Sequence, residues 1–112
     1  MRDLTEIIKE INDWQDKVFT QATAESTAAH LLREAKELYD DPYDAGEIAD
    51  IFILLAAVAH KTGVDIETAV ERKMAINRLR TWGKPDKQGV VEHVRQTAES
   101  GGIISNSPNT VS

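Results

Sequence analysis

The 112-residue chain has no cysteine, which excludes disulfide bonds, thiolate metal ligands and a thiol nucleophile. It also has no long hydrophobic run. The longest nearly apolar stretch, residues 48–59, contains Asp50 and is too short and too polar to cross a bilayer. Basic residues number 13 against 19 acidic ones, and the net charge of −6 argues against a nucleic-acid-binding protein.

What the chain does contain is 41% hydrophobic residues, enough for a packed core, in a length that allows one domain. The start, Met1-Arg2-Asp3, leads directly into a charged amphipathic segment and does not resemble a signal peptide. We therefore expect a cytoplasmic protein. We expect its domain to cover residues 1–98, followed by a flexible tail over 99–112 that is rich in Ser, Asn, Gly and Pro.

Charge is distributed unevenly along the chain. Residues 1–70 carry 6 basic and 15 acidic side chains, whereas residues 71–95 carry 7 basic and 3 acidic ones. An acidic body with a basic segment suits a ligand that brings both metal cations and anionic groups. The same distribution is also compatible with an ordinary solvated helix face.

Apolar residues recur at helical spacing in most of the chain, and no alternating pattern is long enough for a sheet. The architecture predicted is an all-α bundle of four main helices without strands. The spacing predicts helices over residues 4–20, 26–39, 44–61 and 65–80, and a further short helix over 90–97.

The third predicted helix is apolar on nearly every side over residues 51–59. One side of it can face the core within the chain, but the other sides need a further cover. We therefore expect a homo-oligomer, a dimer or a tetramer, built around this helix.

Four carboxylates on the second and third predicted helices form the pattern with the clearest chemistry. Glu34 and Glu37 are three residues apart, as are Glu47 and Asp50, so each pair shares one helix face. A turn near Pro42 makes the two helices an antiparallel hairpin, which places Glu34 opposite Asp50 and Glu37 opposite Glu47. Four carboxylates this close repel one another unless a cation joins them, and Mg²⁺ or Mn²⁺ prefers oxygen ligands. The pattern predicts a metal site.

Taken singly, three of these acids have simpler explanations. Glu34 and Glu37 are compatible with solvent-facing helix positions, and Glu47 with a helix cap. Asp50 is harder to explain, because it is a poor helix former within an apolar run. A ferritin-like di-iron site is not indicated, because none of the three histidines follows a Glu by three residues.

The pattern Glu34-x-x-Glu37 followed by Glu47-x-x-Asp50 resembles the metal-binding signature of the MazG-like all-α nucleoside triphosphate pyrophosphohydrolases. The resemblance covers about residues 10–95. Three further segments are similar, more specifically, to the phage dATP/dGTP pyrophosphohydrolase (MazZ) branch: Trp14-Gln15, His30-Leu31 and Lys73-x-x-x-Asn77-Arg78-x-x-x-Trp82-Gly83-Lys84-Pro85.

The resemblance implies Mg²⁺-dependent hydrolysis of purine deoxynucleoside triphosphates to the monophosphate and pyrophosphate, with Mn²⁺ as a substitute. Cations held by the four carboxylates would activate a water that attacks the α-phosphorus. Glu37 is the first choice and Glu34 the second for the carboxylate that orients this water. The branch also implies a place in phage 2-aminoadenine DNA precursor metabolism, in the host cytoplasm.

The resemblance implies a set of substrate-binding residues as well. Lys73 and Asn77 are assigned to phosphate or sugar, assisted by Arg78 or Arg80, although surface ion pairing is the alternative for at least one arginine. The full set is Trp14, Gln15, His30, Lys73, Asn77, Arg78, Arg80 and Trp82.

Other members of this set have structural alternatives too. Trp14 and Trp82 are candidates for base stacking, although a Trp at helical spacing is more often a core residue. Gln15 is a candidate for reading a base edge, and otherwise a surface residue. His30 lies one turn before Glu34 and would orient that carboxylate, contact substrate or simply pack.

A second class of function stays open. In this alternative the chain is a non-catalytic helical oligomerisation module with a structural cation site or none. Product analysis after incubation with deoxynucleoside triphosphates and Mg²⁺ separates the two. Neither hypothesis includes a nucleic-acid or a membrane partner.

Overall fold

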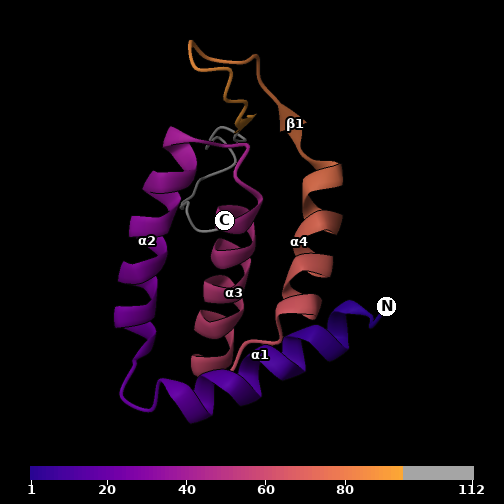
Figure 1. Ribbon diagram of the computed structural model, residues 1–112. Helices are drawn as coiled ribbons and strands as arrows, with labels where there is room; N and C mark the ends of the chain where they lie inside the picture. Colours follow the sequence, from indigo (N-terminus) through magenta and orange to yellow (C-terminus); the bar gives the residue numbers. More distant parts are fainter. Residues whose placement is uncertain (95–112) are drawn as a thin grey trace. The chain divides into compact units, whose positions relative to one another are not determined.

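The computed structural model describes residues 1–94. The predicted tail, 99–112, and the end of the predicted short helix, 95–97, lie outside the described residues. Four helices account for most of the described chain, so the expected all-α architecture is confirmed, with bounds within two residues of those predicted (Figure 1). The elements are α1 (Leu4–Val18), α2 (Ala24–Asp40), α3 (Ala45–Lys61), α4 (Ile66–Leu79), β1 (Thr81–Trp82) and β2 (His93–Val94).

The prediction of no strands, and of a helix beginning at residue 90, was wrong. β1 and β2 pair antiparallel, with Thr81 opposite Val94 and Trp82 opposite His93. The turn that returns the chain is organised by Asp86, whose Oδ1 accepts from the backbone N–H groups of residues 88 and 90 at 2.9 and 2.8 Å. Gly89 has a φ of 83° in this turn, a left-handed conformation that glycine adopts without strain. These local hydrogen bonds fold residues 86–90 into a turn, and the chain forms a hairpin. The spacing of the valines in this segment is, by itself, also compatible with a helix.

Capping side chains determine where the helices begin. Asp3 and Glu6 form the predicted capping box at α1, and Thr23 with Ser26 forms a second one at α2. The second box starts α2 two residues earlier than its apolar pattern indicates. Asp44 caps α3 by accepting from the backbone N–H of Glu47 at 3.1 Å, which places Glu47 in the first turn of that helix.

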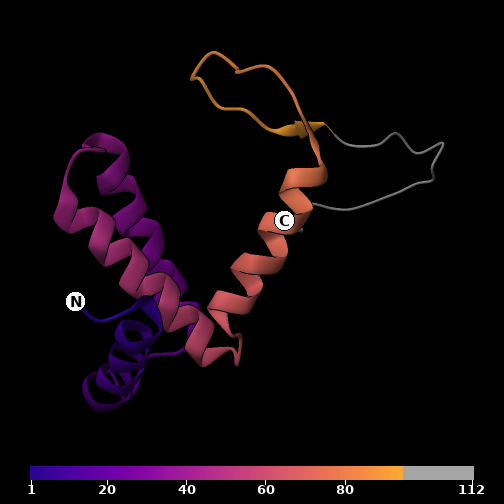
Figure 2. The same ribbon diagram turned by 90° about the vertical axis from the view of Figure 1, so that its right-hand side faces the viewer.

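The described chain divides into two compact units, one over Met1–Ala69 and one that begins at Val70, and each is described by itself. In the first unit α2 and α3 form the predicted antiparallel hairpin and pack along each other. Figures 1 and 2 both show α1 lying across the start of α2 and the end of α3. The hairpin therefore presents the carboxylates near its turn, away from α1.

The described residues contain a small core. Its buried apolar residues are Ile11 of α1 and three of α3, Leu54, Ala56 and Ala57. The two alanines let α3 approach its neighbours closely. Within the described part of the chain, no helix has the length and apolar character needed to cross a membrane.

Candidate active site

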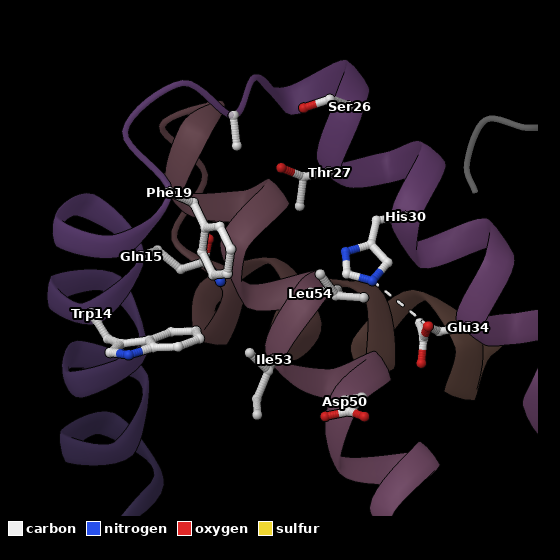
Figure 3. A pocket seen from close by; sticks show the side chains of 11 residues that line it. Trp14, Gln15, Phe19, Ser26, Thr27, His30, Glu34, Asp50, Ile53 and Leu54 are labelled. Atoms are coloured by element: carbon white, nitrogen blue, oxygen red, sulfur yellow. Dashed lines mark ion pairs between the residues drawn. The ribbon is translucent and has the colours of Figure 1, made fainter.

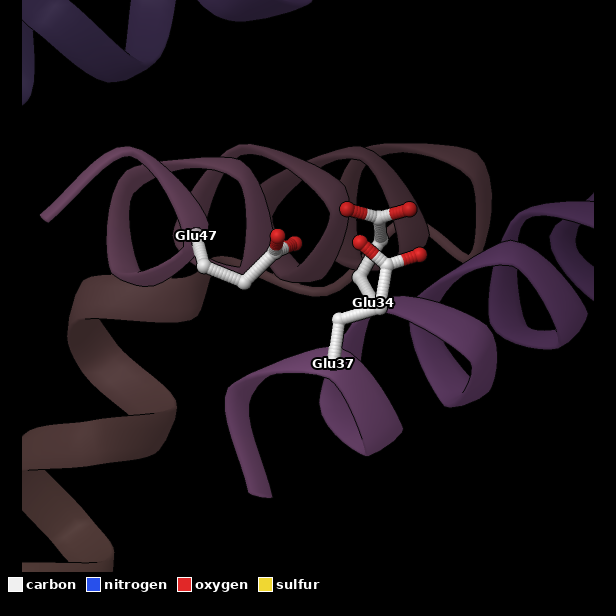
Figure 4. A group of neighbouring side chains, drawn as sticks. All are labelled: Glu34, Glu37 and Glu47. Carbon is white, nitrogen blue, oxygen red and sulfur yellow. The ribbon is translucent and has the colours of Figure 1, made fainter. Parts of the chain in front are cut away.

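Three of the four predicted acids meet between α2 and α3. Each of Glu34, Glu37 and Glu47 offers a carboxylate oxygen, and these oxygens lie within 4.8 Å of one another (Figure 4). Glu34 and Glu47 are half-buried, and Glu37 is exposed. The i, i+3 spacing on α2 and the antiparallel turn place these side chains together, as the sequence pattern predicts.

Charge is poorly balanced at this cluster. Oε1 of Glu47 is buried, and no donor among residues 1–94 meets it. The pKa of Glu47 is raised to about 7, and the largest cause is a hydrogen bond shared with Glu34, which two carboxyl groups can form only when one is protonated. Desolvation and the negative charges of Glu34 and Glu37 contribute to the same rise. The cluster therefore needs either a bound proton or a cation.

A divalent cation fits the residues present. The donor set consists of carboxylate oxygens only, which suits Mg²⁺ and Mn²⁺. Nε2 of His30 lies 3.6 Å from Oε2 of Glu34 and can hold that carboxylate in place. The most direct sign of a cation site is Oε1 of Glu47, which is buried and accepts no hydrogen bond from residues 1–94.

Asp50, the fourth predicted acid, is not part of the group within 4.8 Å. It lies one turn further along α3 and lines the adjoining pocket together with Glu34. Its side chain is one methylene shorter than that of Glu, so a position facing Glu34 on the hairpin does not bring its oxygens to the cluster. Glu34 is thus shared between the cluster and the pocket.

The adjoining pocket has a cavity volume of about 340 Å³, within the range of small-molecule sites. Figure 3 shows Trp14 and Phe19 on one side of it and Glu34 with Asp50 on the other. The lining residues come from α1, the 19–22 segment, α2 and α3: Trp14, Gln15, Phe19, Ala22, Ser26, Thr27, His30, Glu34, Asp50, Ile53 and Leu54. One pocket therefore joins an aromatic end to an acidic end.

The pocket brings together Trp14, Gln15 and His30, three of the predicted substrate-binding residues. The rings of Trp14 and Phe19 meet edge to face, with centroids 5.2 Å apart. Phe19 was missed as a site residue because its spacing matched the apolar stripe of the first helix. Gln15, expected on the surface if it has no role, is only 3% exposed.

The second unit contains the remaining predicted binding residues. Arg80 Nη1 lies 3.5 Å from both Asn77 Oδ1 and Nδ1 of His93. Desolvation, and then the charge of Arg80, lowers the pKa of Lys73. Trp82 donates its indole N–H to the backbone oxygen of Asn77 at 3.1 Å and packs edge to face on His93.

Lys73 and Asn77 are thus on one side of α4, as their spacing indicates, and Arg80, which follows the helix, contacts Asn77 there. Arg78 is exposed. His93 joins this basic group through the pairing of β1 with β2. The sequence analysis missed it because the strand pairing was not predicted.

Comparison with known proteins agrees with this geometry. The sequence profile of the dATP/dGTP pyrophosphohydrolase family matches residues 7–100. A dATP/dGTP diphosphohydrolase of Salmonella phage PMBT28 is 38% identical over 101 residues, which is 89% of this chain and 34% of that protein. This chain therefore spans about a third of the length of that relative. A dATP/dGTP diphosphohydrolase of Cyanophage S-2L is 36% identical over 93 residues, 81% of this chain and 88% of that one.

A solved structure shares the fold. It is the Cyanophage S-2L MazG-like pyrophosphohydrolase bound to dGDP and three catalytic Mn²⁺ ions per active site. The TM-score is 0.73 at 33% identity, covering 86% of this chain and 97% of that one. The profile match over most of the chain, the two relatives and the shared fold lead to the same assignment. The chain belongs to the dATP/dGTP pyrophosphohydrolase family and has its MazG-like all-α fold.

Proposed function

We propose that this chain hydrolyses dATP and dGTP to the monophosphate and pyrophosphate with the help of Mg²⁺ or Mn²⁺. The observation that carries the proposal is the cluster of three carboxylates, with its orphaned Glu47 oxygen, beside a pocket with aromatic walls. A triphosphate brings the cations that the acids require, and a base brings the flat apolar surface that suits Trp14 and Phe19. The names of the two phage relatives support the same substrate class.

Glu34, Glu37 and Glu47 would hold the cation, with Asp50 as an added ligand on the pocket side. A divalent cation bound there would neutralise phosphate charge and make a nearby water easier to deprotonate. Glu37 is the proposed base that takes the proton of the attacking water, because it is the most exposed of the three. Glu34 is the second choice, since His30 holds one of its oxygens.

The bond changes are those of a single displacement at phosphorus. The water oxygen bonds to the α-phosphorus as the bond from that phosphorus to the α–β bridging oxygen breaks. One water proton passes to the carboxylate base, and pyrophosphate leaves with the bonding pair. We propose that Lys73, Asn77, Arg80, Arg78 and Trp82 bind phosphate or sugar, which their cationic and polar groups suit.

Product analysis tests the proposal. The chain is incubated with each deoxynucleoside triphosphate in turn, with Mg²⁺ and with Mn²⁺, and the products are separated. We expect dAMP or dGMP with an equal amount of pyrophosphate, and little turnover of dCTP and dTTP. Release of orthophosphate would contradict the proposed bond cleavage. No turnover of any triphosphate would favour the non-catalytic oligomerisation module.

The proposal also includes a metabolic role for the reaction. Removal of dATP together with release of dGMP would suit a phage that replaces adenine by 2-aminoadenine, acting in the host cytoplasm. This extension requires turnover of both purine substrates in the same assay.

A further inference from the structure

Gln15 is a buried polar side chain without a protein partner. It is 3% exposed, and among residues 1–94 no group donates to or accepts from its side-chain amide. Thr27, the other buried polar residue, satisfies its hydroxyl by donating to the backbone oxygen of Thr23 at 2.7 Å. Among the described residues, the fully buried side-chain atoms without a partner are Asn12 Oδ1 and Glu47 Oε1, so the Gln15 amide is reached from the adjoining space. Its hydrogen-bond partner is therefore expected in whatever fills that space. That space is the pocket, toward which Gln15 extends from α1 beside Trp14 (Figure 3).

The hydroxyl groups near the aromatic end are already committed. The Ser26 hydroxyl accepts from the backbone N–H of Thr23 at 2.9 Å and donates to its carbonyl at 3.2 Å. The Ser26 and Thr27 hydroxyls both bond to the backbone of Thr23, which is the N-cap residue of α2. His30 is turned toward Glu34 at the acidic end. Of the residues that line this pocket, Gln15 and the indole N–H of Trp14 therefore remain uncommitted at the aromatic end, and of these two Gln15 alone offers an acceptor as well as a donor.

A carboxamide presents one donor and one acceptor side by side, and a half-turn of the terminal bond exchanges them. In adenine, the N6 donor lies next to the N1 acceptor. In guanine, the O6 acceptor lies next to the N1 donor, so the order is reversed. No protein hydrogen bond holds the Gln15 amide in one orientation, and either order can therefore be matched.

We propose that Gln15 is the specificity-determining residue that lets one pocket accept both purines, by reversing its amide between adenine and guanine. This inference rests on the proposed function. Cytosine and thymine carry the same two orders of donor and acceptor, so the amide does not reject them. The larger purine ring brings this edge further from the sugar, toward Gln15.

The test compares kcat/KM for dATP and dGTP in the full chain. Gln15→Leu removes both hydrogen bonds, and we expect both values to fall together by tenfold or more. Gln15→Glu introduces a carboxyl that keeps a donor and an acceptor while protonated and becomes an acceptor alone when ionised. The ionised form suits the N1–H and N2–H donors of guanine and opposes N1 of adenine. At pH 7.5 a Glu side chain is ionised, so we expect the dGTP to dATP ratio of Gln15→Glu to be about tenfold higher than that of the wild type.

Controls separate this effect from folding and from catalysis. Gln21→Glu makes the same change at an exposed position outside the pocket and should leave the ratio at its wild-type value. An indirect effect on the catalytic acids alters both substrates equally and cancels in the ratio. Circular dichroism checks that each variant folds. If Gln15→Leu does not fold, the nearly isosteric Gln15→Glu tests the inference by itself.

The analogue dITP gives a second measurement, since it keeps O6 and N1–H but lacks the 2-amino group. The proposal expects its kcat/KM to stay within about threefold of that for dGTP, whereas 1-methyl-dGTP should lose tenfold or more. A wild-type ratio in Gln15→Glu, or loss of only one purine in Gln15→Leu, would overturn the inference. If the wild type hydrolyses no triphosphate, the proposed function fails by itself. Calorimetric Kd values for dAMP and dGMP then provide the same comparison of variants.

Discussion

Glu47 is where burial and charge conflict most clearly in this chain. One of its oxygens is buried without a donor, and two other carboxylates lie within 4.8 Å. A proton relieves the conflict at low pH, and a cation can do so at any pH at which the acids are ionised. The residue therefore links stability, pH and metal binding.

We predict that the metal-free protein loses stability as the pH rises from 4.5 to about 7. The pKa of Glu47 is raised from 4.5 to about 7 in the folded chain, so in this window the folded state binds more protons than the unfolded state. Stability then falls with rising pH and levels off above 7. Thermal unfolding in the presence of a chelator, at steps between pH 4 and pH 8, measures the effect.

Glu47→Gln should flatten this dependence and raise the melting temperature of the metal-free protein at pH 8. Glu25→Gln, an exposed change on α2, should retain the slope of the wild type. Adding Mn²⁺ at pH 8 should stabilise the wild type more than Glu47→Gln. An equal slope in both variants would show that Glu47 is not the group responsible.

The roles of Glu37 and Asp50 lead to a second prediction at this scale. Glu37→Gln and Asp50→Ala should each lower kcat for dGTP by 100-fold or more, because they remove the proposed base and a proposed ligand. The helical circular dichroism signal should change little, since Glu37 is exposed and α3 keeps its cap. Full activity in both variants, with Glu25→Gln as the reference, would mean that the site is misassigned.

At the scale of elements, the start of α3 connects folding to the site. Asp44 caps this helix and Glu47 is in its first turn, so the cap and the metal cluster depend on the same few residues. The turn over residues 40–45 fixes the register of α2 against α3. This register brings the carboxylates of the cluster together. A cap lost here should affect both stability and metal affinity.

We predict that Asp44→Ala lowers the free energy of unfolding by about 1 kcal/mol, the usual cost of a lost N-cap. The same variant should bind Mn²⁺ more weakly, because fraying of the first turn moves Glu47. Asp44→Asn preserves an acceptor at the cap and should stay close to the wild type. Urea unfolding and metal titration measure the two effects, and identical behaviour of the two variants would contradict a capping role.

For the molecule as a whole, the small core is the main observation. Only four apolar residues are buried among residues 1–94, and α4 has no buried residue. Large apolar side chains remain exposed on the helices, including Leu55 of α3 at 45% and Leu79 of α4 at 89%. A single chain that leaves this much apolar surface in water is expected to associate with further copies.

We predict a homo-oligomer that depends on α3. Light scattering at micromolar concentration should give a mass that is a multiple of 12.4 kDa. Leu55→Glu should reduce it, since the change places a charge on the exposed apolar side of that helix. Gln21→Glu adds the same charge elsewhere and should leave the mass unchanged. A monomeric wild type would refute the prediction.

The sequence by itself determined the four helices, the hairpin of α2 with α3 and the cluster of Glu34, Glu37 and Glu47. These features depend on local rules: helical periodicity, capping side chains and the matching of positions across a short antiparallel turn. The family resemblance also depended on these linear patterns, and the comparisons confirmed it. Asp50 shows where this reasoning ends, because facing positions on two helices do not determine how far a side chain reaches.

Only the tertiary structure decided which side chains are buried and what lies next to them. It placed α1 against the hairpin and so buried Gln15, made Phe19 a pocket wall and moved Asp50 from the cluster to the pocket. It also paired β1 with β2 and brought His93 to Arg80. Each of these outcomes depends on contacts between segments far apart in the chain, and helical spacing specifies the face of a residue but not the element that covers it.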